Sequence, residues 1–166
     1  MPQQASGYAD VVDTIAKTVK AMVQGSAEKG WPYASNFLEI EDYINTYMRI
    51  GLTAHEKAVW HSLHLVRIEV AENHRGNGLF TATLAKLLEF CTEHGIVIKL
   101  ENVFNQRLEQ FLLRQEGWQV LRDSEWAYRL SSGNQESPVS IIYVPSTAIP
   151  VEQQIEAHQG REANAR

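Results

Sequence analysis

The chain has 166 residues, of which 44% are hydrophobic and 21% are charged, and its formal net charge is −5. Length and composition are those of a single globular domain with a sizeable core. The negative charge and the lack of a basic stripe argue against nucleic-acid binding, and no apolar run approaches the ~20 residues of a membrane span.

Cysteine occurs once, at Cys91, so an internal disulfide is excluded. The residue lies in a helical apolar pattern, which favours a place in the core over a role as nucleophile. The first residues lack the basic-then-apolar pattern of a signal peptide. These features predict a cytoplasmic protein in a reducing compartment.

Two helices are predicted before the first clear strand. Residues 8–23 carry apolar side chains at helical spacing. Asn36 and Glu39 have the spacing of a capping box for a second helix, which Gly51 would close. Because these helices occupy the N-terminal part, the early strands of the sheet are predicted to be shortened or missing.

A glycine-rich turn then joins a strand to a helix. Residues 63–70 form an apolar β-type run, residues 79–90 have a helical pattern, and His-Arg-Gly-Asn-Gly-Leu-Phe fills positions 74–80. Glycines take positive φ angles and let a backbone come close to a bulky ligand. A helix start presents free N–H groups and a positive dipole end, which suits a phosphate. The plainer interpretation is an ordinary glycine-rich connection.

The remaining segments are predicted in order. Residues 96–101 read as a strand, which Asn-Val-Phe-Asn, an amphipathic stretch at 108–113 and Gly117-Trp118 follow. Residues 118–121 and 126–130 are expected to form a hairpin, and residues 139–144 an edge strand. We expect one domain over residues 1–145 and a polar, weakly ordered tail over residues 146–166.

The two strand–helix segments resemble one protein family. Arg-x-x-Gly-x-Gly/Ala at a strand-to-helix turn is the acyl-CoA pyrophosphate loop of the GCN5-related N-acetyltransferase (GNAT) superfamily, and residues 75–80 resemble it, with Phe80 at the last position. Strand, Asn, short helix and Gly-aromatic resemble its second CoA-contacting segment, with Leu113 where the family has a tyrosine acid. Together the segments span residues 63–130. The sequence Glu-Asn-Val-x-Asn-x-Arg-Leu, which begins at Glu101, is similar to short phage-encoded members of the family.

The resemblance implies an α/β fold in which flanking helices pack on a mixed sheet and the two central strands splay apart. It implies transfer of an acyl group, expected to be acetyl, from acetyl-CoA to an amine on a protein or a small molecule. The alternative is a non-catalytic protein of this fold that binds and modulates a partner protein, which Phe80 and Leu113 favour. Neither a nucleic acid nor a membrane is an expected partner, and a homodimer remains open.

The resemblance also assigns residues to the cofactor. Backbone amides of the turn would hold the pyrophosphate, the edge of the first central strand would pair with the pantetheine arm, and an asparagine would hydrogen-bond that arm. The residues so assigned are Ile68, Val70, Arg75, Gly76, Asn77, Gly78, Leu79, Phe80 and Asn105.

Charged residues occur where the central strands should be apolar. Arg67 and Glu69 share one face of the first strand, and Lys99 and Glu101 share one face of the second. Such charges are costly unless they are paired or open to a cleft. The resemblance implies that the acyl group and the acceptor meet between these two strands. Glu69 and Glu101 are therefore candidates for the general base that deprotonates an amine, and a structural ion-pair network is the alternative.

Histidines do not complete a metal site in the sequence. His61 and His64 are three residues apart, and on a strand they would point to opposite faces. No carboxylate or cysteine completes a known ligand spacing, so we expect no metal. His74 is expected to face solvent beside the turn.

Overall fold

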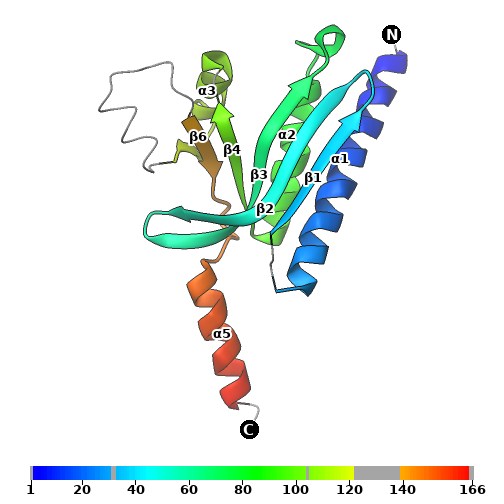
Figure 1. Cartoon of the computed structure of the whole chain (residues 1–166). Helices are drawn as coiled ribbons and strands as arrows, with labels where there is room; N and C mark the ends of the chain where they lie inside the picture. Colours follow the sequence, from blue (N-terminus) through cyan, green and yellow to red (C-terminus); the bar gives the residue numbers. More distant parts are fainter. Residues whose placement is uncertain (1, 31–32, 104, 122–138, 165–166) are drawn as a thin grey trace.

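The computed structural model describes residues 2–30, 33–103, 105–121 and 139–164, and the α/β prediction is confirmed by one mixed six-stranded sheet with helices packed on it (Figure 1). The strands lie in the order β1-β2-β3-β4-β6-β5. Their bounds are β1 (Ala34–Ile40), β2 (Ile44–His55), β3 (Ala58–Val70), β4 (Val97–Val103), β5 (Trp118–Val120) and β6 (Val139–Tyr143). The helices are α1 (Pro2–Glu28), the 3-10 turn η1 (Glu72–His74), α2 (Leu79–His94), α3 (Gln106–Leu113) and α5 (Val151–Asn164).

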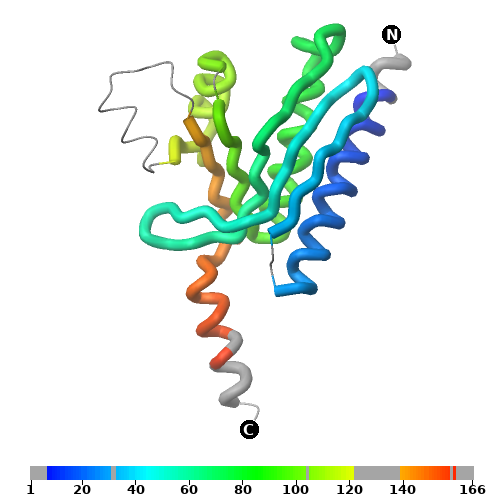
Figure 2. The backbone as a smooth tube through the Cα atoms, in the orientation of Figure 1, coloured from blue at the N-terminus to red at the C-terminus, as the bar shows by residue number. Residues whose placement is uncertain are grey.

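The core lies between the sheet and the pair formed by α1 and α2, which run side by side across β1 to β4 (Figures 1 and 2). Ile50, Leu63 and Ile98 form one cross-strand row on the covered face, and all three are buried. From α1, Ile15 and Val19 pack into the same cluster. The helix predicted at 8–23 and the helix predicted at 79–90 are therefore both present and apolar on the side that meets the sheet.

The predicted second helix and the shortened early strands are wrong. Residues 34–40 and 44–55 form an antiparallel pair of strands instead. In β2 the side chains of Ile44, Thr46, Met48 and Ile50 are buried in strict alternation, which is the period of a strand. Asp42 adopts φ = 66° in the connecting turn, which Asp tolerates better than most residues.

A second antiparallel hairpin joins β2 to β3 through a two-residue turn. Glu56 and Lys57 both have positive φ, as the tight type I′ hairpin turn requires. The hairpin curves away from the rest of the sheet (Figure 1). Trp60, at the start of β3, packs against a small second cluster that consists of Val97, Leu121 and Ile142.

Strands β3 and β4 are parallel neighbours, as predicted, but they pair over only four residues of each strand. Ser62 to Leu65 of β3 pair with Val97 to Leu100 of β4. On its other side β3 carries a bulge, because Met48 and Tyr47 of β2 face Leu65 and Arg67, and Val66 is left over. An extra residue bends a strand, and here the bend coincides with the point where β3 leaves β4.

The C-terminal part differs from the expectation. Strand β6 is not an edge strand, because it lies between β4 and β5. The segment after Pro150, expected as a polar tail, forms α5, which projects from the sheet (Figure 1). The strand predicted at 126–130 lies outside the described residues.

Candidate functional site

A cavity of about 630 Å³ lies where β3 and β4 separate. Its walls come from β2, β3, β4 and the start of α3. Polar side chains gather at Tyr47, Arg67, Glu101, Asn102 and Asn105. The apolar part of the wall consists of Leu65, Val66, Ile68, Leu100, Val103 and Leu108. The cavity therefore has a mostly apolar wall and a charged end at Glu101, an arrangement typical of small-molecule sites.

The glycine turn follows directly after β3 and ends at α2. Gly76 and Gly78 have φ angles of 74° and 84°, and no atom lies within 4 Å of where a Cβ would stand at either. Gly78 is the N-cap of α2, with no side chain capping the helix. The Arg75 Nε donates to the Val70 carbonyl at 2.9 Å. Open space thus adjoins the free N–H groups of a helix start, where an anion is favoured.

His74 does not stand free beside this turn. Its ring stacks on Tyr43 with ring centroids 4.5 Å apart, and its Nδ1 lies 2.9 Å from the Tyr8 hydroxyl oxygen. The three rings connect α1 and the β1–β2 turn to η1. The expectation of a solvent-facing histidine is therefore wrong, and the contacts fix the residue that precedes Arg75.

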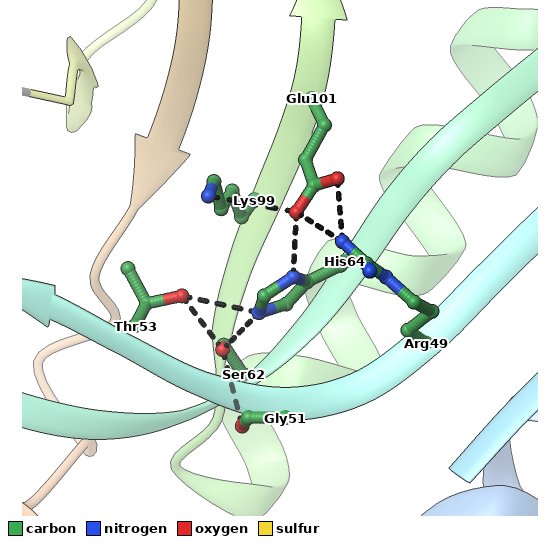
Figure 3. Close-up of polar contacts among 7 residues, drawn as sticks. All are labelled: Arg49, Gly51, Thr53, Ser62, His64, Lys99 and Glu101. Carbon is green, nitrogen blue, oxygen red and sulfur yellow. Dashed lines mark hydrogen bonds and ion pairs between the residues drawn. The ribbon is translucent and has the colours of Figure 1, made fainter. Parts of the chain in front are cut away.

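On the sheet face opposite the core row, a polar row crosses the three central strands. Arg49, His64 and Lys99 are direct cross-strand partners, and Glu101 follows two residues after Lys99 on the same face. The Glu101 carboxylate accepts hydrogen bonds from Arg49 Nη2 at 2.8 and 2.7 Å and from His64 Nδ1 at 2.7 Å (Figure 3). The Lys99 ammonium lies 3.5 Å away. Glu101 is thus the centre of the cluster.

The surroundings shift the pKa values of this cluster. Burial opposes the charge of Glu101, but Lys99, His64 and Arg49 together hold the pKa of its carboxyl below the usual value. Burial also lowers the pKa of His64, and Glu101 opposes that shift only in part. At neutral pH the pair is therefore a carboxylate beside a neutral imidazole.

Ser62, His64 and Glu101 are connected like the nucleophile, base and orienting acid of a hydrolase. Ser62 Oγ lies 2.7 Å from His64 Nε2, and Thr53 Oγ1 lies 3.2 Å from the same nitrogen (Figure 3). Ser62, however, is fully buried and does not line the cavity. Because no substrate can reach its hydroxyl, the arrangement does not support nucleophilic catalysis by Ser62.

The other predicted base, Glu69, lies in a different environment. It pairs with Arg67 at 2.6 Å on the same strand, and its side chain is 46% exposed, against 12% for Glu101. Arg67 holds the pKa of the Glu69 carboxyl below its usual value. Glu69 lines a smaller cavity of about 180 Å³, together with Arg75. The predicted ion pairs are thus present but form two separate clusters, and of the two glutamates only Glu101 lines the large cavity.

The second predicted CoA segment surrounds the start of α3. Asn105 lines the cavity and caps the helix, since its Oδ1 accepts from the amides of Arg107 and Leu108. Its side-chain N–H groups are not used by this cap. Leu113, at the position of the expected tyrosine, is 38% exposed at the end of α3.

Tyr47, Arg49 and Ser62 are absent from the predicted site. Tyr47 lines the cavity, but its segment was predicted to be the second helix and not a strand. Arg49 and Ser62 could have been found only from the strand alternation of β2 and from the two-residue spacing of Ser62 and His64.

Among the residues that the structure describes, no group of three or more His, Cys, Asp or Glu side chains could hold a metal ion. None of the described helices is long and apolar enough to cross a membrane. No protein-family model and no curated protein matches this chain.

Proposed function

We propose that the chain is an acyl-CoA-dependent N-acyltransferase that transfers acetyl from acetyl-CoA to an amine on a protein or a small molecule. The observation that carries this proposal is the separation of parallel β3 and β4 after four residue pairs, around a cavity of about 630 Å³. The GNAT resemblance calls for such a splay, followed by a glycine turn at a helix start. Both features occur in this order along β3 and α2.

The glycine turn is suited to the pyrophosphate of the acyl donor. The amides of Asn77 to Phe80 lie at the N-terminal end of α2, and the dipole of this 16-residue helix favours negative charge there. The positive φ at Gly78 and the empty space beside it allow two phosphates to approach the backbone. Phe80 is half-buried and packs against the core, so its side chain does not compete for this space.

The pantetheine arm would lie along β3 in the cavity. Beyond Leu65, β3 is paired with β2 but not with β4, so backbone groups around Ile68 and Val70 are available on the β4 side, apart from the Val70 carbonyl that accepts from Arg75. Asn105 is suited to hydrogen-bond the arm through its side-chain N–H groups, because its Oδ1 already caps α3. These contacts would direct the thioester towards the end of the cavity that Glu101 lines.

In the reaction, Glu101 accepts a proton from the acceptor amine, directly or through a water molecule. The amine nitrogen then forms a bond to the thioester carbonyl carbon, the carbon–sulfur bond breaks, and CoA leaves as a thiolate that takes up a proton. The lowered pKa keeps Glu101 ionised at neutral pH but makes it a weak proton acceptor. Holding amine and thioester together is therefore expected to supply much of the rate.

Turnover of two matched variants tests the assignment of the base. Glu101→Gln should reduce acyl transfer by ~10²–10⁴, the usual contribution of a positioned general base, whereas Glu69→Gln should leave it nearly unchanged. Release of the CoA thiol, with a panel of amines and peptides as acceptors, is the measurement. Acetyl-CoA affinity should stay the same in both variants, because the turn is untouched.

The opposite ranking, with Glu69→Gln inactive and Glu101→Gln active, would move the base to Glu69. Normal turnover in both variants would remove both carboxylates from the mechanism.

A non-catalytic CoA-binding or partner-binding protein is the second candidate. The exposed Leu113 favours it, since the position that carries the acid in the family has no ionisable group here. In that case wild-type protein would bind acetyl-CoA without releasing thiol for any acceptor. Among the described residues that line the cavity, Tyr47 has the hydroxyl that an active enzyme would use to protonate the thiolate.

A further inference from the structure

We propose that His64 is a positioning residue, which holds the Glu101 carboxylate in one orientation, and thereby sets how readily Glu101 accepts a proton. The inference rests on the proposed function, because it assigns Glu101 the role of base. It goes beyond that function by giving a role to a histidine that touches neither the cavity nor the glycine turn. The contacts on the two ring nitrogens carry it.

The first step is the position of the hydrogen on the His64 ring. Nδ1 lies 2.7 Å from Glu101 Oε1. An ionised carboxylate only accepts hydrogen bonds, so Nδ1 must carry the hydrogen whether the ring is neutral or charged. In the neutral ring Nε2 then becomes an acceptor, and the hydroxyl of Ser62 at 2.7 Å is placed to donate to it.

The second step is the difference between the two oxygens of Glu101. Oε1 has three donors near it: His64 Nδ1 at 2.7 Å, Arg49 Nη2 at 2.8 Å and Lys99 Nζ at 3.5 Å. Oε2 has one contact among the described residues, with Arg49 Nη2 at 2.7 Å. His64 therefore occupies one oxygen and leaves the other with an open lone pair, which is the one we assign to the incoming proton.

The third step is what holds His64 itself. Its side chain is 6% exposed, and its second nitrogen contacts Ser62 and Thr53, both buried. The Ser62 hydroxyl can donate either to His64 or to the Gly51 carbonyl oxygen at 3.2 Å (Figure 3). The buried hydroxyl groups at Nε2 thus hold the imidazole ring, and they can donate to it or accept from it in either of its charge states. These contacts keep Nδ1 directed at Glu101.

The charged groups that face His64 are Arg49 from β2 and Lys99 and Glu101 from β4. The hydrogen bond from His64 is one of the influences that lower the pKa of the Glu101 carboxyl. Removing this donor should raise that pKa, so that a larger fraction of Glu101 is protonated at a given acidic pH. The acid limb of the pH profile of kcat/KM should then move to higher pH.

Two substitutions at one position test the proposal. His64→Leu removes the donor, whereas His64→Asn keeps an N–H group near the place of Nδ1 but cannot titrate. Glu89→Gln, in an exposed ion pair on α2, is the control for an unrelated carboxyl change. The readouts are the pKa of Glu101, followed by ¹³C NMR of its carboxyl and assigned with Glu101→Gln, and the pH profile of kcat/KM.

The proposal predicts that His64→Leu raises the pKa of Glu101 and moves the acid limb by the same amount. It should also lower kcat by roughly 10–100-fold, because the loss of a fixed carboxylate orientation outweighs the gain in basicity. His64→Asn should keep both pH readouts near wild type. A purely structural His64 would lower the melting temperature in both variants and move neither pH readout, which would overturn the proposal, as would identical behaviour of the two variants. Lack of turnover in wild type would instead overturn the proposed function, while the NMR readout would still report on the contact between His64 and Glu101.

Discussion

Glu69 and Glu101 are equivalent in the sequence pattern but not in their surroundings. Each lies two residues after a cation on a central strand, and each pairs with that cation. Glu101 has in addition Arg49 and His64, is mostly buried, and lines the large cavity. Strand alternation alone identified the two carboxylates. It could not separate them, because Arg49 and His64 come from segments whose pairing the pattern did not show.

The Glu101–His64 pair should make stability depend on pH. In the folded protein the pKa of the Glu101 carboxyl is below its usual value of 4.5. The ionised carboxylate therefore contributes its full stabilisation above pH 4.5, and this contribution is lost as the pH falls through the pKa of the folded state. The pKa of His64 in the folded protein is below its usual value of 6.5. On acidification His64 is therefore protonated first in the unfolded chain, which also lowers the free energy of unfolding below pH 6.5.

Urea unfolding at several pH values between 7 and 3.5 checks this dependence. The free energy of unfolding should fall steadily on acidification in wild type. In Glu101→Gln it should be lower at pH 7 and fall less below about pH 4.5, with Glu89→Gln as the control for an exposed carboxyl. Parallel curves for Glu101→Gln and wild type would show that Glu101 is not stabilised in its charged form.

The early strands show why element prediction failed where it did. Neither β-hairpin has a glycine in its turn: Asp42 supplies one positive φ angle, and Glu56 and Lys57 supply the others. Without the usual turn residues, the half-buried Tyr43 and Tyr47 were compatible with a helical face. From β3 onwards the apolar runs and the glycine turn were compatible with only one order of strands and helices. The bounds of α2, β4 and α3 were therefore predicted within a few residues of those observed.

Helix α1 is expected to contribute to cofactor binding through His74. Tyr8→Phe removes the hydroxyl that contacts His74 Nδ1, while the ring contacts remain. The turn would then have to be ordered on binding, which costs affinity. Since a hydrogen bond is worth about 0.5–1.5 kcal/mol net, acetyl-CoA affinity should fall by up to about tenfold.

Calorimetric titration of Tyr8→Phe with acetyl-CoA measures this effect. Tyr33→Phe is the matched control, because Tyr33 is 73% exposed. Equal affinities for the two variants would mean that α1 does not help to order the turn.

For the molecule as a whole, the functional features lie in the part before α5. The described side chains at 152–157 are exposed, among them Ile155, although α5 contacts β3. A chain that ends at Pro150 should therefore fold with nearly the same thermal midpoint as the full chain. A large drop in the midpoint would show that α5 packs on the domain or on a second subunit and is part of the folded unit.

Binding of acetyl-CoA at the glycine turn is the most direct test of the proposed function. Gly78→Glu puts a negative side chain beside the helix start, whereas Gly30→Glu introduces a similar backbone strain, about 1–2 kcal/mol, at a distant glycine that also has φ near 80° and open space around it. By calorimetry, we expect wild type and Gly30→Glu to bind acetyl-CoA and Gly78→Glu to show no binding. No heat from wild type with millimolar acetyl-CoA, or equal binding by Gly78→Glu and Gly30→Glu, would contradict the assignment of the turn and with it the proposed acyltransferase.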